Sequence, residues 1–380
     1  MVETRRKPTK RIFGLDLLRV ISIVLVLCSH TSLIYPPSSS LLSKAVDLSG
    51  FFGVELFFVM SGFLIGGIIF KQFVGKDYGI KTMAVFLYRR LMRILPNYYL
   101  IVLINIAIWL WFGYSLTQTW KYFFFFQNFA TPLLPFFPES WSLPIKEFGY
   151  LIAVILLYLC SLVFKRVSRK SIFIGVIVGM IIFFFSCKIY YNFHTHNTTM
   201  LQWDVSLRSV VIYRVDTVLL GVLFGFIASE YPIFWKRQQY KFAVVGFLLI
   251  GLLLFCLGYL RLTILDFPWF WNVLCLPMNA LGLVCFLPFF SEWKMAPVQY
   301  AKPVIFFSEI SYAIYLLHYS IVLFLMKHFI DTTAFTMMQL HLFTIAYLAI
   351  TVFLSILMYT YFEKPMMKLR EIKIFGHEAR

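Results

Sequence analysis

Three ionisable residues stand within one apolar segment near the start of this chain. Residues 14–31 read GLDLLRVISIVLVLCSHT, which is apolar enough to cross a bilayer, yet the segment contains Asp16, Arg19 and His30. Ionisable side chains at membrane depth are costly, and they normally face a protein interior or a watery cavity. The segment therefore predicts a site within the bilayer, with acid–base chemistry at the end that carries His30.

The spacing of these residues places them on one face of a helix. Arg19 and His30 are eleven residues apart, about three turns, so their side chains share a face roughly 16 Å apart along the axis. Asp16 lies three residues before Arg19, within pairing distance. A fixed cation toward one membrane surface and an imidazole toward the other would suit a site threaded through the bilayer. The simpler alternative is an Asp16–Arg19 anchor among the lipid headgroups and an interfacial, hydrogen-bonded His30.

The composition is that of a membrane protein. Of the 380 residues, 61% are hydrophobic and 13% charged, and the mean hydropathy is +0.82, far from ordinary globular usage. A net charge of +17 would suggest nucleic-acid binding in a soluble protein, but here the basic residues gather at one set of expected helix ends. The six cysteines form no CxxC pair, so we expect no disulfide framework and no metal.

Apolar runs of sufficient length predict ten membrane-spanning helices. They lie near residues 12–34, 51–70, 95–113, 147–164, 171–190, 211–229, 241–260, 271–290, 305–328 and 341–362. An even number returns both termini to one side, and 25 of the 34 Lys and Arg residues then share that side, in clusters at 5–11, 71–93, 165–170, 236–241, 294–302 and 364–380. By the positive-inside rule this side is the cytoplasm. We expect an all-α polytopic protein with both termini cytoplasmic, forming one transmembrane domain over residues 1–380 without a separate soluble domain.

Further polar groups mark other segments. Arg93 shares a helix face with Arg89 and Arg90, and guanidinium groups on one face suit phosphate binding; the alternative is a topology anchor. Two long loops on the opposite side, near 114–146 and 190–210, combine tryptophan with amide side chains. This combination suits sugar recognition, although an aromatic belt at the bilayer surface would look the same. The pairs Gly62/Gly66, Gly175/Gly179 and Gly221/Gly225 predict close helix packing.

Seven segments carry a common pattern when they are taken in order. They read LDLLRVISIVLVLCSHT, GFFGVELFFVMSGFLIG, YRRLMRILPNYY, SWSLPIKEFGYLI, YRVDTVLLGVLFG, SYAIYLLHYSIV and YFEKP. Together they resemble the membrane acyltransferase-3 family of bacterial O-acyltransferases. The resemblance implies a ten-helix core in the bacterial inner membrane, acetyl-coenzyme A as cytoplasmic donor, and as acceptor a hydroxyl of an extracytoplasmic glycan or glycolipid such as lipopolysaccharide O-antigen.

The resemblance and the residue patterns together give a set of expected roles. We expect His30 to act as general base, with Arg19, Asp16 and Glu147 also in the catalytic site. We expect donor contacts from Arg19, Arg89, Arg90 and Arg93, and acceptor contacts from Trp141, Ser142, Arg214, Asp216, Ser311, Tyr312 and His318. The chain departs from the family at Lys146, which stands where the first of two acids is expected, so any acid–base role for Glu147 needs a one-residue shift.

Two other classes of protein fit parts of the pattern. A transporter or flippase could use buried charges as a relay, although no matching pair of Gly/Pro-broken helices divides the chain into two halves. A membrane enzyme with a lipid-linked acyl donor is the second alternative. The sequence contains no HExxH, Walker or GxSxG motif, which argues against metalloprotease, nucleotide-hydrolase and ordinary esterase chemistry.

Overall fold

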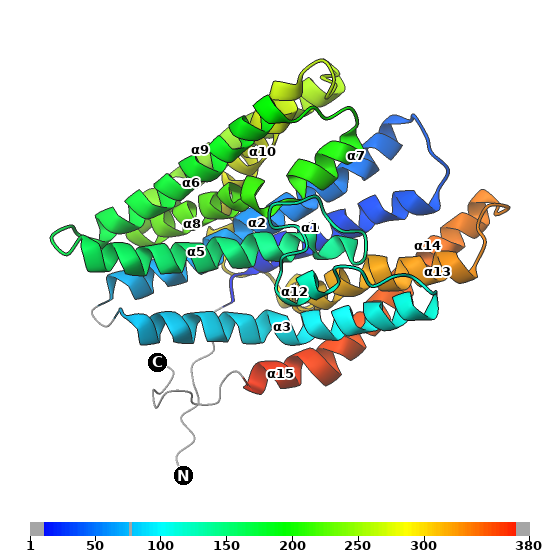
Figure 1. Ribbon diagram of the computed structural model, residues 1–380, viewed down its shortest axis with the longest axis horizontal. Coiled ribbons are helices and arrows are strands. Elements are labelled where there is room, and N and C mark those ends of the chain that lie inside the picture. Colours follow the sequence, from blue (N-terminus) through cyan, green and yellow to red (C-terminus); the bar gives the residue numbers. More distant parts are fainter. Residues whose placement is uncertain (1–10, 76–77, 370–380) are drawn as a thin grey trace, which may run out of the picture.

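The computed structural model describes residues 11–75 and 78–369, and these residues form helices and connecting loops without a β-strand (Figure 1). The α-helices are α1 (Phe13–Thr31), α2 (Leu41–Val74), α3 (Ile80–Trp111), α4 (Trp120–Phe123), α5 (Ser142–Val163), α6 (Arg169–His194), α7 (Met200–Trp203), α8 (Val215–Glu230), α9 (Pro232–Gly258), α10 (Cys275–Val284), α11 (Leu287–Glu292), α12 (Val298–Leu317), α13 (Phe324–Phe329), α14 (Met337–Met358) and α15 (Lys364–Leu369). Four shorter turns shape the site: η2 (Pro138–Trp141), η3 (Asp204–Arg208), η4 (Val211–Tyr213) and η6 (His318–Leu323).

Within the described residues, nine helical segments are long and apolar enough to cross a membrane. Each of the ten predicted spans coincides with helix, and the all-α prediction is confirmed. The predicted span 211–229 is the exception in length, because the 3₁₀ turn η4 precedes α8 and leaves it 16 residues, about 24 Å at 1.5 Å per residue. The side of the membrane on which the termini lie stays a prediction. Some of the basic residues that were assigned to the cytoplasmic side lie outside the described residues, namely Arg5, Arg6, Lys7, Lys10, Lys76, Arg370, Lys373 and Arg380.

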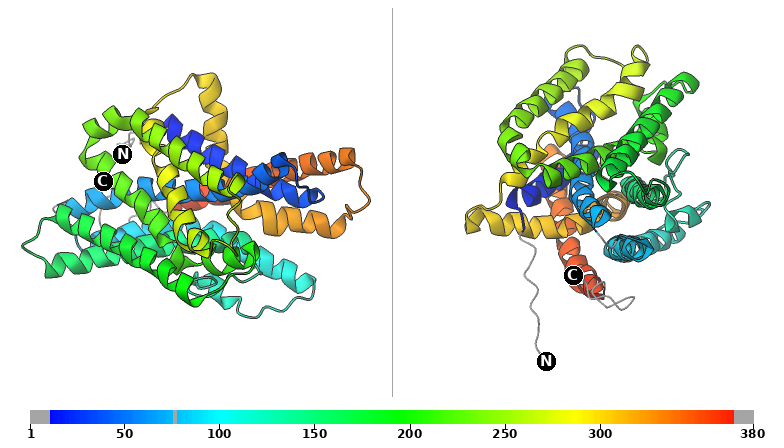
Figure 2. Two further views of the ribbon diagram at one scale, coloured as in Figure 1. Left: turned by 90° about the horizontal axis from the view of Figure 1, so that it is seen from above. Right: turned by 90° about the vertical axis from the view of Figure 1, so that its left-hand side faces the viewer.

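Helices α1 and α2 run through the middle of the bundle. Figure 1 shows α6, α8, α9 and α10 on one side of them and α3, α12 and α13 on the other. Figure 1 and the left-hand view of Figure 2 place the α1–α2 connection and the α13–α14 connection at the same end of the molecule. A hydrogen bond from Lys327 Nζ to the carbonyl oxygen of Leu33, 2.8 Å long, joins α13 to the α1–α2 connection.

Helix α2 extends well beyond the predicted span 51–70. It begins at Leu41, where the Ser40 side chain caps it by accepting a hydrogen bond from the backbone of Ser43 at 3.2 Å. Its 34 residues give a length of about 51 Å, more than the roughly 30 Å of a hydrocarbon core. The first turns of α2 therefore project past the apolar span, and they carry Lys44 and Asp47.

The crossing of α2 and α8 is built on two of the three predicted glycine pairs. A Cβ atom added to Gly62 would overlap the carbonyl oxygen of Val218, and one added to Gly221 would overlap that of Val59. Backbones approach this closely only where side chains are absent. Gly175 and Gly179 have no atom within 4 Å of such a Cβ, so their spacing does not mark a tight crossing.

Candidate active site

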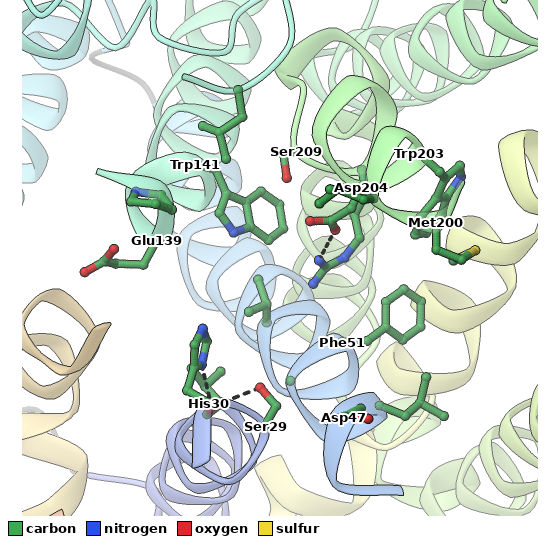
Figure 3. A pocket seen from close by; sticks show the side chains of 18 of the residues that line it. Ser29, His30, Asp47, Phe51, Glu139, Trp141, Met200, Trp203, Asp204 and Ser209 are labelled. Atoms are coloured by element: carbon green, nitrogen blue, oxygen red, sulfur yellow. Dashed lines mark hydrogen bonds and ion pairs between the residues drawn. The ribbon is translucent and has the colours of Figure 1, made fainter. Parts of the chain in front are cut away.

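A cavity of about 650 Å³ opens between α1, α2, η2, α7 and η3 (Figure 3). We call it the His30 cavity. Polar and aromatic side chains line it, among them His30, Lys44, Asp47, Glu139, Trp141, Trp203, Arg208 and Tyr319. Its size lies within the range of small-molecule sites. The His30 cavity is therefore the leading candidate for a substrate site.

His30 stands in the last turn of α1, and its hydrogen bonding fixes its tautomer. Its Nδ1 lies 2.9 Å from the carbonyl oxygen of Val26. A carbonyl oxygen can only accept, so Nδ1 carries a hydrogen, and in the neutral imidazole Nε2 then keeps its lone pair. Figure 3 shows the ring directed into the cavity, between Glu139 and Trp141. This is the arrangement that a general base requires.

A second histidine lies directly behind His30. The ring of His318, in η6, meets that of His30 edge to face, with centroids 4.7 Å apart, and Tyr319 packs on His30 at 4.8 Å. His318 Nδ1 lies 2.8 Å from the carbonyl oxygen of Tyr315, while its Nε2 has no hydrogen-bond partner among the described residues. The structure thus joins two residues that the sequence predicted separately, but His318 is buried and contributes nothing to the cavity wall.

Glu139 is a site residue that the sequence did not indicate. Its Oε1 accepts hydrogen bonds from the backbone nitrogen and the hydroxyl of Ser320, at 2.9 and 2.7 Å. Its backbone oxygen accepts from the Tyr315 hydroxyl at 2.6 Å, and the same hydroxyl bonds Ser142 Oγ at 2.7 Å. Glu139 therefore holds η2 against η6, the turn that supplies His318. The sequence signal that could have indicated Glu139 is an acidic residue that follows a proline and stands two residues before Trp141.

The two long loops form one wall of the His30 cavity. The side-chain nitrogen of Asn128 donates to the carbonyl oxygen of Trp141 at 2.9 Å and to that of Ser209. Two backbone hydrogen bonds also join these segments. The Leu133 nitrogen donates to the Val205 carbonyl oxygen at 3.1 Å, and the Val211 nitrogen donates to the Asn128 carbonyl oxygen at 2.9 Å. The predicted sugar-recognition loops are thus joined to each other beside His30.

Arg208 lies in this wall against an aromatic surface. Its guanidinium carbon stands 4.9 Å from the ring centre of Trp141 and 5.5 Å from that of Phe51, and it forms an ion pair with Asp204. Burial opposes the charge, but nearby acidic groups, with Asp204 as the largest contributor, more than offset this and raise the pKa of Arg208. Arg208 is therefore a paired cation held between two aromatic rings in the wall of the cavity.

Toward the start of α1, the predicted Asp16–Arg19 pair is present. Arg19 Nη1 lies 3.5 Å from Asp16 Oδ1 and 3.1 Å from Ser308 Oγ. Asp16 also accepts from Arg11 at 3.3 Å and from Ser308 at 2.6 Å. Ser311, on the same helix as Ser308, donates to the Ser308 carbonyl oxygen at 2.8 Å. This group joins α1 to α12 and lies apart from the cavity lining.

Of the three third-span arginines, Arg90 forms an ion pair with the fourth-span acid Glu147. Arg90 bonds both oxygens of Glu147, at 3.1 and 2.7 Å, and its guanidinium carbon stands 4.1 Å from the ring centre of Tyr150. Glu147 is buried there, outside the lining of the His30 cavity. Arg89 is half-buried and Arg93 exposed on the same helix, and the Tyr312 hydroxyl ties α12 to α3 through the Ile94 carbonyl oxygen at 3.2 Å.

Arg214 and Asp216 lie in a separate buried network. Arg214 pairs with Glu55 of α2, and Asp216 with Lys188 of α6. All four side chains are at most 6% exposed, and none lines the His30 cavity. An acceptor role for Arg214 and Asp216 stays a prediction that this placement does not favour.

In the part of the chain that the structure describes, no group of three or more His, Cys, Asp or Glu side chains is arranged to hold a metal ion.

Comparison with known proteins gives a consistent picture. The sequence profile of a family described as "Acyltransferase domain" matches residues 12–360. A Staphylococcus aureus (strain COL) protein that is named provisionally as an O-acetyltransferase is 26% identical over 393 residues, covering 96% of this chain and 59% of the relative. The peptidoglycan O-acetyltransferase OatA of Listeria monocytogenes is 24% identical over 301 residues, or 66% of this chain and 45% of the relative.

A second staphylococcal relative, the O-acetyltransferase OatA of Staphylococcus aureus (strain NCTC 8325), is 23% identical over 350 residues, which cover 84% of this chain and 52% of the relative. The chain therefore spans about half to three fifths of the length of these curated relatives. No solved structure is significantly similar to it.

Proposed function

Because the chain belongs to the membrane acyltransferase family whose profile spans residues 12–360, we propose that it is an O-acetyltransferase of a bacterial inner membrane. It moves an acetyl group from cytoplasmic acetyl-coenzyme A to a hydroxyl of an extracytoplasmic glycan. The observation that carries the proposal is His30, whose Nδ1 is bonded to a backbone carbonyl oxygen and whose ring is directed into a cavity lined by tryptophan rings and Arg208 (Figure 3). The names of the relatives support acetyl transfer as the reaction.

His30 performs the proton transfers in this proposal. Its Nε2 takes the proton of the acceptor hydroxyl as that oxygen bonds to the acetyl carbonyl carbon, and it returns the proton to sulfur as the carbon–sulfur bond breaks. Acetyl-coenzyme A supplies the activated thioester. The Val26 carbonyl oxygen holds the imidazole in the required tautomer, and the His318 and Tyr319 rings fix its plane.

The acceptor is proposed to lie against the loop wall. Trp141 and Trp203 in the cavity lining offer apolar contacts to a sugar, and Arg208 and Lys44 offer donors for hydroxyl or carboxylate groups. The name of the Listeria relative specifies peptidoglycan. This favours a peptidoglycan-like acceptor over the lipopolysaccharide O-antigen that the sequence suggested.

The donor is proposed to approach from the opposite end of α1, where Arg19 lies. Basic side chains of α1 and α3 gather on this side, and they suit the phosphates of coenzyme A. The Arg90 guanidinium is already bonded to both carboxylate oxygens of Glu147. Arg90 can therefore form fewer hydrogen bonds with acetyl-coenzyme A than its sequence position suggested. From Arg19 the acyl arm reaches His30 along roughly 16 Å of helix.

The proposal is tested with purified protein in lipid nanodiscs. Acetyl-coenzyme A and a peptidoglycan fragment are supplied, and release of free thiol is measured together with acetylation of the glycan. We expect thiol release that depends on the acceptor and is lost in His30→Gln. The matched control is His194→Gln, since His194 also places Nδ1 against a carbonyl oxygen at the end of a helix, 2.8 Å from Tyr190 O, but is exposed and away from the cavity.

Two results would contradict the proposal. One is release of free thiol that does not depend on the acceptor, and the other is a folded protein that releases no thiol at all. Passage of the glycan across the membrane without acetylation would favour a transporter instead.

A further inference from the structure

A second cavity, of about 500 Å³, lies beside the His30 cavity. Its lining comes from α3, from the residues just before η2, from η6 and from α13, and we call it the α3–α13 cavity. Pro138 and Tyr319 line both cavities. Glu139 in the lining of the first bonds the hydroxyl of Ser320 in the lining of the second at 2.7 Å. The two cavities therefore share a wall.

The interior of the α3–α13 cavity is mostly apolar. Its apolar lining includes Ile108, Trp109, Phe136, Leu323 and Phe324. Two buried polar side chains in the lining are already bonded within the protein. Asn105 donates to the Ile101 carbonyl oxygen at 2.9 Å, and Ser320 donates to Glu139. A sugar would find few hydrogen-bond partners here, whereas a hydrocarbon chain would gain by leaving water.

Two exposed basic side chains of α13, Lys327 and His328, complete the lining of this cavity. Lys327 gives one ammonium hydrogen to the Leu33 carbonyl oxygen and keeps the others for a further acceptor. The His328 ring lies against that of Phe112, at the end of α3, with ring centres 4.0 Å apart. The cavity thus combines an apolar interior with a basic rim.

The rim lies at the end of the molecule that holds the α1–α2 connection, to which Lys327 is bonded. In the predicted orientation this end is extracytoplasmic, where the positive-inside rule asks for no lysine. Trp111 and Tyr114, close to the rim at the end of α3, are 78% and 47% exposed, and exposed Trp and Tyr side chains are typical of the bilayer interface. Topology therefore leaves Lys327 unexplained, at the depth of lipid phosphate groups.

We propose that the α3–α13 cavity binds the lipid part of a lipid-linked glycan acceptor, with the chain in the apolar interior and the linking phosphate on Lys327. The inference rests on the proposed function, because that function places the glycan in the adjoining His30 cavity. A lysine binds phosphate as a point charge, and the shared wall puts the two parts of one acceptor side by side. The lipid then holds the glycan beside His30.

An acyl group longer than acetyl is the other chain that this cavity suits, because Tyr319 both packs on His30 and lines the cavity. Such a chain would fill the apolar interior. It carries no charge, however, and would leave Lys327 and His328 without a role. A lipid phosphate uses the interior and the rim together, and is therefore the occupant that the lining favours.

The test uses a peptidoglycan disaccharide, either free or joined through a phosphodiester to a farnesyl chain. Acetylation is measured in nanodiscs for Ile108→Trp, which fills the cavity, and for Leu103→Trp, a control at an exposed position of the same helix outside the lining. We expect Ile108→Trp to raise the KM of the farnesyl acceptor about tenfold, the effect of excluding about two methylene groups. The free disaccharide and kcat should be unaffected, and Leu103→Trp should change neither KM.

Lys327→Met tests the phosphate contact. We expect the KM of the farnesyl phosphodiester acceptor to rise about 3- to 10-fold, a modest loss because the ammonium group is exposed. A farnesyl glycoside without phosphate should not respond, and Lys327→Arg should keep most of the affinity. The control is Lys121→Met, since Lys121 Nζ also donates to an amide oxygen, that of Gln118 at 2.6 Å, but lies outside both linings.

Photolabelling tests the site without catalysis. A farnesyl phosphate with a photoreactive chain is added to protein in phosphatidylglycerol nanodiscs, and labelled peptides are identified by mass spectrometry. We expect labels on α3 and on η6–α13 that decrease in Ile108→Trp and persist in Leu103→Trp. Labelling that is absent in phosphatidylglycerol but appears in detergent would show that bilayer lipid fills the cavity, and would overturn the inference.

Two kinetic outcomes also overturn it. One is an equal KM for the farnesyl acceptor in wild type and in Ile108→Trp. The other is a loss in Ile108→Trp that appears only with longer acyl donors, which would assign the cavity to the acyl chain. If no acceptor is acetylated but the cavity is still labelled, the proposed function fails and the lipid site stands. Should Ile108→Trp not fold, an unchanged KM in Lys327→Met has the same meaning.

Discussion

Two regions of this bundle hold ionisable side chains, and they use them differently. In the α2–α6–α8 region, Glu55, Arg214, Lys188 and Asp216 form two ion pairs that are almost entirely closed to solvent. In the His30 cavity, Arg208 is paired but lines the open space, and the His30 ring is directed into the cavity. The first region holds helices together, and the second leaves groups available to a ligand.

The difference teaches that charge within the bilayer does not identify a site by itself. Buried ionisable residues in membranes are functional by default expectation, and this expectation led to Arg214 and His30 alike. Their surroundings separate them: Arg214 is fully buried and paired with Glu55, whereas a cavity of about 650 Å³ adjoins His30. The experiments below test this separation, beginning with the largest expected effect.

The largest effect is expected from His30→Gln. Glutamine keeps a hydrogen-bonding side chain but cannot transfer a proton, so turnover should fall roughly 10²- to 10⁴-fold while donor binding persists. The wild-type pH–rate profile should contain a limb from a titrating imidazole, and the residual activity of the variant should lack it. Steady-state assays from pH 5 to 9 measure both. Near wild-type turnover with the limb intact would remove the catalytic role of His30.

Removing an ion pair of the buried α2–α6–α8 region should lower the stability of the protein instead of its turnover. Glu55→Ala leaves Arg214 buried without its partner, and we expect a loss of about 3–5 kcal/mol in the free energy of unfolding. The double variant Glu55→Ala/Arg214→Met should recover much of that loss, because no unpaired charge remains. Denaturation in nanodiscs measures the change. A stable Glu55→Ala protein with weakened acceptor binding would show instead that this region is open to substrate.

A smaller effect is expected at the α2–α8 crossing. Gly221→Ala should lower the free energy of unfolding by about 1–3 kcal/mol, because the new methyl group overlaps the Val59 carbonyl oxygen. Gly175→Ala is the matched control, since its methyl group would meet nothing within 4 Å, and alanine favours helix by up to about 1 kcal/mol. Equal destabilisation by both substitutions would show that the crossing does not depend on glycine.

The smallest effect is expected in the cavity wall. Arg208→Lys keeps the charge but loses the planar group that lies over Trp141, worth about 0.5–2 kcal/mol. The KM for the glycan should rise severalfold with little change in kcat and none in the affinity for coenzyme A. Arg166→Lys, at an exposed position, serves as control. A fall in kcat without a change in KM would move Arg208 from acceptor binding to chemistry.

The sequence predicted those features that depend on local geometry. The Asp16–Arg19 pair follows from a three-residue spacing, and the positions of the spans follow from apolar runs. The pairing of Arg90 with Glu147 could not be predicted, because it joins residues of two helices whose relative rotation is set by packing. The importance of Glu139 was hidden for the same reason, since its partner Ser320 lies far away in the chain.

The glycine pairs show the same limit. Gly175/Gly179 and Gly221/Gly225 have identical spacing, but only the second pair faces another backbone. Spacing defines a helix face, and only the tertiary structure decides what that face meets. The length of α8 was likewise set by η4, a turn for which the apolar run gave no sign.

The length of α2 has a mechanical consequence. One continuous rod carries Lys44 and Asp47 at the mouth of the cavity and Gly62 at the crossing with α8. Lys44 lies 18 residues from Gly62, a lever arm of about 27 Å. A tilt of about five degrees pivoting on the crossing would move the mouth by about 2 Å. A displacement too slight to disturb the core would thus be amplified at the rim, in a direction that widens or narrows the entrance.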